Sequence, residues 1–248
     1  MSQKINPIII IGAPRSGTNI LRDTLSTLRN IHTWNCDEIP YIWRYGNKKF
    51  KTDKLTPDMV NPRIKSYIRS QFSKIVGNVN TDFVLEKTCA NSLRVDFVNE
   101  VFPEAKFIYI VRNGIDVTSS IMQRWESKFS LSYTMKKFKY VPNFDIPYYG
   151  YEFLKNRIYK TKGNNRLEFW GPRFEENNKI LNLSLEEICA SQWVACVNSS
   201  NKSFKKIDPQ RLFSLSYEDF VKRPNKLILK MLEFVGINLG SDLKFPLV

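Results

Sequence analysis

A glycine-bounded loop near the start of the chain has residue types that suit anion binding. It reads Gly12-Ala-Pro-Arg-Ser-Gly-Thr-Asn19 and stands between an apolar run and a helical pattern. In that position, successive backbone N–H groups and a helix N-terminus can hold a phosphate. Gly12 and Gly17 have the spacing of a nucleotide-triphosphatase loop, but Thr18 replaces its lysine and the cation is Arg15. These residues predict a P-loop-like turn that binds phosphate without a metal ion.

A second pair of residues could bind another phosphate. Arg112 directly follows the apolar run 106–111, and Ser120 lies eight residues later in a helical pattern. Two helical turns return the serine to the side on which the strand ends. A guanidinium and a hydroxyl placed there can both hydrogen-bond to one phosphate group.

Together these motifs resemble those of a known family. Pro14-Arg-Ser-Gly-Thr18 resembles the 5′-phosphosulfate loop of sulfotransferases that use 3′-phosphoadenosine 5′-phosphosulfate (PAPS), and Arg112 with Ser120 resembles their 3′-phosphate motif. Glu86-Lys-Thr88 and Ser216-Tyr-Glu-Asp-Phe-Val221 agree with the family in the same order. The chain is thus identified as a member of the PAPS-dependent sulfotransferase family, similar to its bacterial, tyrosylprotein and Golgi carbohydrate types.

The resemblance implies an enzyme that transfers a sulfuryl group from PAPS to a hydroxyl acceptor, with no metal ion. It implies that Arg15 stabilises the leaving phosphate, and that Tyr217 contacts the adenine edge. Asn19 stands where the family more often has a second threonine. The cofactor-binding residues that the resemblance implies are Arg15, Ser16, Gly17, Thr18, Asn19, Arg112, Ser120, Arg124 and Tyr217.

The transfer also needs a group that takes the proton of the acceptor hydroxyl. Cytosolic members have a histidine for this purpose where the chain has Cys89. Tyrosylprotein and Golgi types use a glutamate soon after the first helix, which implies Glu38, with Asp37 as the adjacent alternative. Glu86 is the second candidate base because it neighbours Lys87, which the resemblance places on the sulfuryl or phosphate oxygens.

The order of apolar segments predicts the fold that positions these residues. Short apolar runs alternate with stretches of helical periodicity, which favours parallel βαβ units. We therefore expect an α/β protein, a three-layer sandwich with a parallel sheet and helices on both faces. The expected strands are 7–12, 83–85, 106–111 and 212–216, and the expected helices are 18–28, 93–101, 114–125 and 225–235.

The segment 128–180 lacks clear periodicity and predicts a substrate-facing insertion or lid within a single domain, 1–248. It is rich in basic and aromatic side chains, a mixture that suits a sugar stacking on rings. We therefore predict a carbohydrate acceptor, with a peptide tyrosine, a lipid or a small alcohol as alternatives. The residues concerned are Lys136, Lys137, Lys139, Tyr140, Phe144, Tyr148, Tyr149 and Tyr151.

Composition sets the remaining limits. The hydrophobic fraction of 42% and charged fraction of 25% are those of a globular chain. No apolar run approaches the roughly 18 residues of a membrane span, so we expect a cytoplasmic protein. The four cysteines lack metal-ligand spacing, and no metal site is expected. Nothing in the sequence predicts an oligomeric state.

The formal net charge of +14 fits nucleic acid, an anionic membrane, an acidic polysaccharide or a phosphorylated cofactor. The ordered phosphate motifs favour the cofactor over nucleic acid. A P-loop kinase would need a lysine at Thr18 and an acidic magnesium ligand after a strand. A catalytically impaired, sulfotransferase-like protein that binds polyanions stays open as the alternative.

Overall fold

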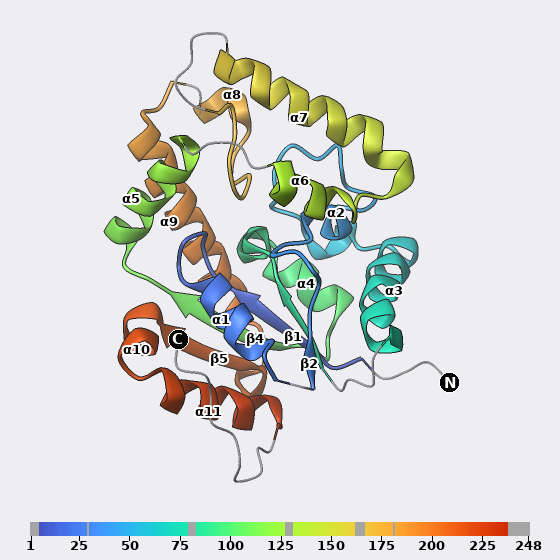
Figure 1. The fold of residues 1–248 in the computed structure, drawn as a ribbon, viewed down its shortest axis with the longest axis vertical. Helices are drawn as coiled ribbons and strands as arrows, with labels where there is room; N and C mark the ends of the chain where they lie inside the picture. Colours follow the sequence, from blue (N-terminus) through green and yellow to red (C-terminus); the bar gives the residue numbers. More distant parts are fainter. Residues whose placement is uncertain are drawn as a thin grey trace.

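A five-stranded, all-parallel sheet lies at the centre of the computed structural model (Figure 1). The structure describes residues 5–28, 30–78, 83–126, 131–161, 167–180 and 182–237. The strand order across the sheet is β2-β3-β1-β4-β5. The strands are β1 (Pro7–Ile11), β2 (Ile31–His32), β3 (Phe83–Lys87), β4 (Lys106–Val111) and β5 (Leu212–Ser216).

Strand β1 occupies the middle of the sheet because it is apolar on both faces. It pairs with β3 on one side and with β4 on the other, and its residues are all buried. Ile8 and Ile10 point into one core, whereas Ile9 and Ile11 point into the other. Such a continuous β-branched run is typical of a parallel strand covered on both sides.

Helices cover both faces, which confirms the three-layer α/β prediction. Leu21 and Leu25 of the first helix share a core with Ile8, and helices α10 and α11 complete this layer. Helices α3, α4 and α9 pack on the opposite face. The helices are α1 (Thr18–Leu25), α2 (Pro40–Trp43), α3 (Pro62–Asn78), α4 (Val95–Val101), α5 (Gly114–Glu126), α6 (Leu131–Phe138), α7 (Ile146–Thr161), α8 (Asn177–Ile180), α9 (Leu185–Phe204), α10 (Tyr217–Lys222) and α11 (Pro224–Val235).

Where the structure describes it, the predicted insertion contains three α-helices, and its residues 167–176 are irregular. Helices α6, α7 and α8 lie together at the end of the molecule beyond the carboxyl edge of the sheet (Figure 1). Residues 128–130 and 162–166 of the segment lie outside the described residues. The lid function of this segment, and the single domain over residues 1–248, stay predictions.

Two long helices were not anticipated from the sequence. The buried positions of α9 include Ser200, Ser203 and Gln192, so its inward face does not read as an apolar stripe. Its capping box, Ser184 with Glu187, was nevertheless a visible start signal. Helix α3 differs from α9, because its core residues Ile64, Ile68 and Phe72 have a regular spacing of four. They follow Pro62, the first residue of the helix.

Candidate active site

The turn between β1 and α1 adopts the conformation of an anion-binding cradle. Arg15 and Gly17 both have left-handed backbone angles, with φ values of 65° and 87°. A Cβ on Gly17 would lie 2.4 Å from the Tyr217 ring, so this position requires glycine for space as well as for conformation. The Ser16 hydroxyl is buried and has no hydrogen-bond partner among the described residues. An orphaned donor inside such a turn suits an anionic ligand.

The structure brings the two predicted phosphate motifs together. Arg15 Nε donates a hydrogen bond to Ser120 Oγ at 2.9 Å, across 105 residues of sequence. Arg112 Nη1 donates to the backbone carbonyl of Arg15 at 3.2 Å. The Arg112 guanidinium also lies over the Tyr217 ring, 4.6 Å from its centroid. Arg15, Arg112 and Tyr217, which follow three different strands, therefore meet Ser120 of α5 at one position.

This region concentrates positive charge. Partial burial, followed by the nearby charges of Arg124 and Arg112, lowers the pKa of Arg15. The buried Nε of Arg112 has no hydrogen-bond partner among the described residues. Three neighbouring guanidinium groups repel one another unless an anion lies between them, so the cluster fits a phosphorylated ligand. The described residues contain no cluster of His, Cys, Asp or Glu that could hold a metal ion.

A second group of charges surrounds Glu38. Lys87 Nζ donates to Glu38 Oε1 at 2.9 Å, and the backbone N–H of Cys89 donates to the same oxygen at 3.2 Å. From α6, Lys137 Nζ lies 3.5 Å from Glu38 Oε2 and 3.2 Å from Asp37 Oδ1. The sequence had placed Lys137 only among the basic residues of the insertion. Lys137 and Glu38 are about 100 residues apart in the sequence, and no local sequence pattern predicts that they come into contact.

The charges around Glu38 fix its protonation state. Burial alone would raise the pKa of Glu38, but the positive charges of Lys87 and Lys137 hold it well below its usual range. The pKa of Lys87, which burial would lower, is instead raised to about 12 by Glu38. Both groups are therefore ionised at neutral pH.

Cys89 joins the charged group to the phosphate turn. Its Sγ lies 3.6 Å from Thr18 Oγ1, at the start of α1. Burial raises the pKa of the Cys89 thiol, which is therefore a neutral neighbour at physiological pH. Lys87, Glu38 and the phosphate turn thus form one continuous site. Asn19 is exposed at the first turn of α1.

Glu86 lies behind this site and does not face it. Its side chain is fully buried, and its carboxylate accepts hydrogen bonds from Thr88 Oγ1 at 2.5 Å and from Asn91 Nδ2 at 2.9 Å. The Thr88 hydroxyl in turn accepts from the backbone N–H of Ile39 at 3.0 Å. Burial raises the pKa of Glu86 to about 7. This arrangement favours a residue that positions the Glu38 segment over one that contacts a substrate.

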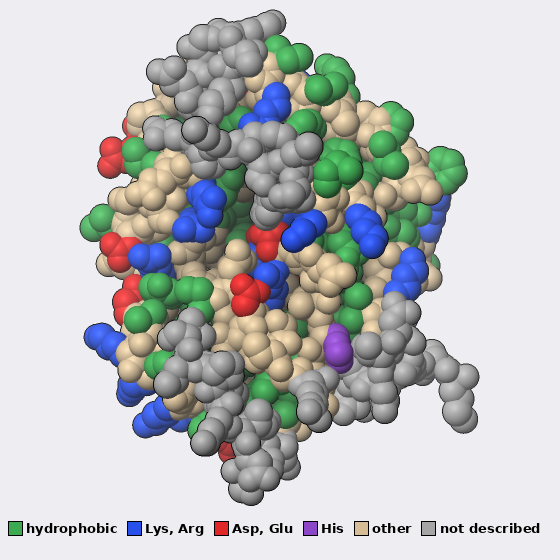
Figure 2. All heavy atoms as spheres, viewed as in Figure 1, with side chains coloured by type: hydrophobic (Ala, Val, Ile, Leu, Met, Phe, Trp, Pro, Cys, Tyr) green, Lys and Arg blue, Asp and Glu red, His purple; other side chains and the backbone are tan. Residues whose placement is uncertain are grey.

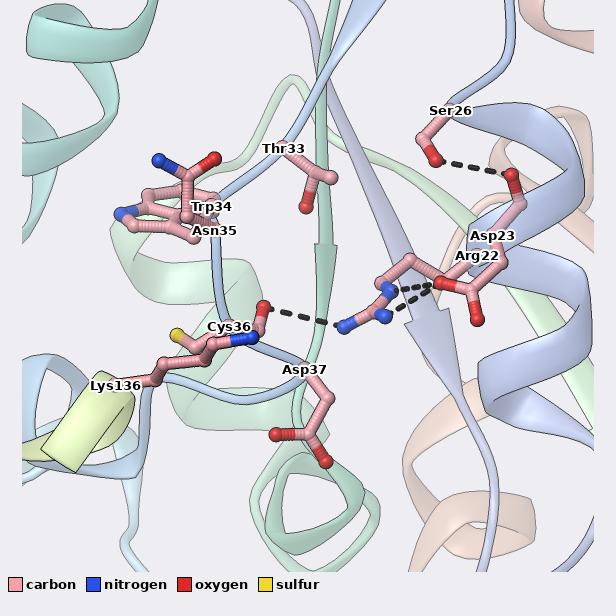
Figure 3. Close-up of a pocket in the computed structure, with 9 residues that line it drawn as sticks. All are labelled: Arg22, Asp23, Ser26, Thr33, Trp34, Asn35, Cys36, Asp37 and Lys136. Carbon is pink, nitrogen blue, oxygen red and sulfur yellow. Dashed lines mark hydrogen bonds and ion pairs between the residues drawn. The ribbon is translucent and has the colours of Figure 1, made fainter. Parts of the chain in front are cut away.

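A pocket of about 350 Å³ opens beside Asp37 (Figure 3). One wall is α1, from which Arg22 reaches across and donates to the carbonyl of Cys36 at 3.1 Å. The other wall is the segment 33–37, and Lys136 of α6 lies at the edge. Figure 2 shows acidic and basic side chains close together in the middle of this face, between α1 and α6. The pocket therefore adjoins the Glu38 group and is lined by polar and charged side chains.

Trp193 of α9 lies away from this site. Its ring packs against Gly114 at the start of α5, where a Cβ would come within 2.9 Å of it. It belongs to the partly buried residues around the core between α5 and α9. This position agrees with the packing role that its helical surroundings favour.

Comparison with known proteins identifies the family of this chain. A model of the sulfotransferase family matches residues 7–152, more than half of the chain. The chain belongs to the sulfotransferase family. Among proteins of curated function, none matches it in sequence. Membership of the sulfotransferase family assigns the chain to the transferases. No helix among the described residues is long and apolar enough to cross a membrane.

Solved sulfotransferase structures share its fold. The sulfotransferase domain from the curacin biosynthetic pathway has a TM-score of 0.58 at 15% identity, covering 97% of this chain and 77% of that one. The corresponding domain of the Synechococcus PCC 7002 olefin synthase gives 0.55 at 14% identity, covering 96% and 76%. Sulfotransferase STF9 from Mycobacterium avium gives 0.57 at 12% identity, covering 95% and 65%. At these identities the likeness concerns the fold alone.

Proposed function

We propose that this sulfotransferase-family chain transfers a sulfuryl group from PAPS to a hydroxyl group of a carbohydrate. The observation that carries the proposal is the meeting of Arg15, Ser120, Arg112 and Tyr217 at one edge of the sheet. A ligand with phosphates at both ends of a ribose would use the two motifs at once. A ligand with a single phosphate would use only one of them.

Each cofactor residue has a role in this proposal. The backbone N–H groups and hydroxyls of residues 16–19 bind the 5′-phosphate at the start of α1. Arg112, Ser120 and Arg124 bind the 3′-phosphate, and Tyr217 borders the adenine. The orphaned Ser16 hydroxyl and the unpartnered Arg112 Nε support these assignments, because each lacks a hydrogen bond that a phosphate oxygen would supply.

In sulfuryl transfer, the protein mainly positions the reacting groups and stabilises the charge that develops. PAPS supplies the sulfuryl group, which moves in line from the leaving phosphate oxygen to the acceptor oxygen. Arg15 and Lys87 stabilise the negative charge that grows on the leaving side. We assign Glu38, which is ionised beside Lys87 and Lys137, as the group that takes the acceptor proton. Glu86 holds the backbone beside Glu38 through Thr88.

The pocket beside Asp37 supports a carbohydrate acceptor. Its lining combines carboxylates, cations, hydroxyls and an amide with the apolar surface of Trp34 and Cys36, and sugars are bound by such a mixture of polar and apolar groups. Asp37 and Lys136 both line it, so an acceptor and a donor are available to sugar hydroxyls. The pocket also adjoins the residue that we assign as the base.

The first test is calorimetric binding of 3′-phosphoadenosine 5′-phosphate, AMP and ATP without magnesium. We expect the 3′-phosphorylated ligand to bind roughly 30-fold or more tightly than AMP, because it adds charge-assisted hydrogen bonds. Arg112→Ala should remove that preference while leaving AMP binding largely intact. Equal binding of all three ligands by the wild-type protein would contradict the cofactor assignment.

Turnover then separates the alternatives. Radiolabelled PAPS is supplied with a sugar, a tyrosine peptide or a small alcohol, and labelled product is measured. Transfer to the sugar supports the carbohydrate proposal, and transfer only to a peptide or alcohol reassigns the acceptor. Tight binding of the nucleotide without transfer to any acceptor would favour the impaired, polyanion-binding alternative.

A further inference from the structure

Helix α7 and the turn before it expose several apolar side chains. Tyr151, Leu154 and Ile158 recur at intervals of three and four residues, which places them on one face of the helix. Figure 2 shows hydrophobic side chains gathered along the upper right of this face of the molecule, over α7. We call four of these residues the α7 stripe: Phe144 (96% exposed), Tyr151 (65%), Leu154 (59%) and Ile158 (50%).

No acidic side chain of residues 143–158, all of which are described, is fully exposed. Asp145 is buried against Lys48, and Glu152 is half-buried and pairs with Arg173 at 3.2 Å. None of the exposed residues of this stretch is acidic. They are Asn143, Phe144, Ile146, Pro147, Tyr151, Leu154, Lys155 and Ile158.

Cations flank the same surface. Lys155 lies on α7 itself, half exposed and 3.1 Å from Glu168. Exposed Met135 lies on α6, and exposed Lys139 follows the end of that helix. Within the described residues, Lys139 forms no ion pair. The insertion thus presents an apolar stripe with a positively charged margin.

This pattern selects the kind of partner. Monomeric proteins seldom expose a continuous apolar patch without a use for it. Two copies of a chain that carries a charge of +14 repel each other, which disfavours self-association through a basic surface. An anionic bilayer offers both apolar depth for the stripe and negative charge for the lysines.

We propose that the α7 stripe docks this protein peripherally on an anionic lipid bilayer. The four stripe residues enter the boundary between headgroups and acyl chains, and Lys139 and Lys155 lie at the headgroup level. Lys137 of the neighbouring helix contacts Asp37 and Glu38, so the docked surface belongs to the segment that also borders the candidate active site. The docking does not depend on the proposed sulfuryl transfer.

The test is flotation of the full chain with phosphatidylcholine vesicles, with and without phosphatidylserine, at low and high salt. The stripe variant is Phe144→Ser with Leu154→Ser. The control is Val221→Ser with Leu229→Ser, which also removes two exposed apolar side chains, 58% and 51% exposed, from α10 and α11. All four positions are exposed, so thermal unfolding curves should show both variants folded. Binding of 3′-phosphoadenosine 5′-phosphate is measured on each protein.

We expect the wild-type protein and the control variant to float with phosphatidylserine vesicles and to be released by salt. The stripe variant should bind these vesicles roughly tenfold or more weakly, because two inserted side chains are lost. Nucleotide binding should be equal in all three proteins, so failure of the docking proposal is distinguishable from failure of the proposed function.

Three results would overturn the docking proposal. The wild-type protein could fail to bind phosphatidylserine vesicles, or the stripe variant could bind them as well as the control does. In the third, sedimentation velocity would show a wild-type dimer that the stripe substitutions dissociate, which would assign the α7 stripe to a second copy of the chain.

Discussion

Two glutamates near the candidate site have opposite protonation behaviour because their neighbours differ. Glu38 lies between two lysines, whose charges outweigh the effect of burial and keep its pKa low. Glu86 has two neutral hydrogen-bond donors, so burial dominates and raises its pKa to about 7. The residue type alone says nothing about this difference. The contacts decide that Glu38 suits a charged role and Glu86 a positioning one.

Glu86 gives a prediction about stability and pH. Because its pKa is higher in the folded protein than in the unfolded chain, folding favours the protonated form. Stability that is fully present below about pH 4.5 should be lost as the pH rises to about 7, by up to about 3 kcal/mol. The measurement is urea unfolding of the wild type and Glu86→Gln at several pH values. The free-energy difference between them should shift in favour of the variant as the pH rises, and parallel curves would contradict the prediction.

At the scale of elements, the β1–turn–α1 unit was readable because its signals are local. An isoleucine run, two glycines and a helical spacing all occur within about 20 consecutive residues. The strand at 212–216 agrees with β5, and the helix expected over 114–125 agrees with α5 to within one residue. Helix α1 ends at Leu25, earlier than the expected 28, and turns lead from there to the unanticipated strand β2.

Gly17 gives a prediction at this scale. Gly17→Ala places a side chain in a left-handed conformation and against the Tyr217 ring, so it should destabilise the fold by about 1–2 kcal/mol or more. It should also weaken binding of 3′-phosphoadenosine 5′-phosphate, because the turn and Tyr217 must move apart. Thermal unfolding and calorimetry measure the two effects.

The matched control is Gly150→Ala within α7. A Cβ there meets no other atom within 4 Å, and alanine favours a helix, so this variant should gain about 0.5–1 kcal/mol. If both glycine variants behave alike, the special conformation of the turn is not what Gly17 supplies.

At the scale of the whole molecule, one buried carboxylate ties three distant segments together. Asp53 accepts hydrogen bonds from Arg44 at 2.8 Å, from Arg94 at 3.1 Å and from the backbone N–H of Arg173 at 2.8 Å. These groups come from the end of α2, the start of α4 and the segment that precedes α8. The insertion is therefore fastened to the body of the protein through a buried charge network.

Asp53→Ala should destabilise the protein by about 3–5 kcal/mol, because it leaves two buried guanidinium groups without their counter-charge. Urea unfolding measures the loss. The control is Lys51→Met, which removes the exposed pair between Lys51 and Glu176 and should change stability by less than about 1 kcal/mol. If both variants lost a similar free energy of unfolding, the buried network would contribute no more to stability than an exposed ion pair does.

The sequence by itself determined the α/β class and the family and predicted the two phosphate motifs, because each of these depends on local patterns and on their order along the chain. Only the tertiary structure decided that Lys137 contacts Glu38, that Glu86 is buried, and that the α7 stripe is exposed. Burial, ion pairing and pKa depend on which residues meet across about 50 to 130 positions of sequence. The packing of the whole chain, and not any local sequence pattern, decides which of these distant residues come into contact.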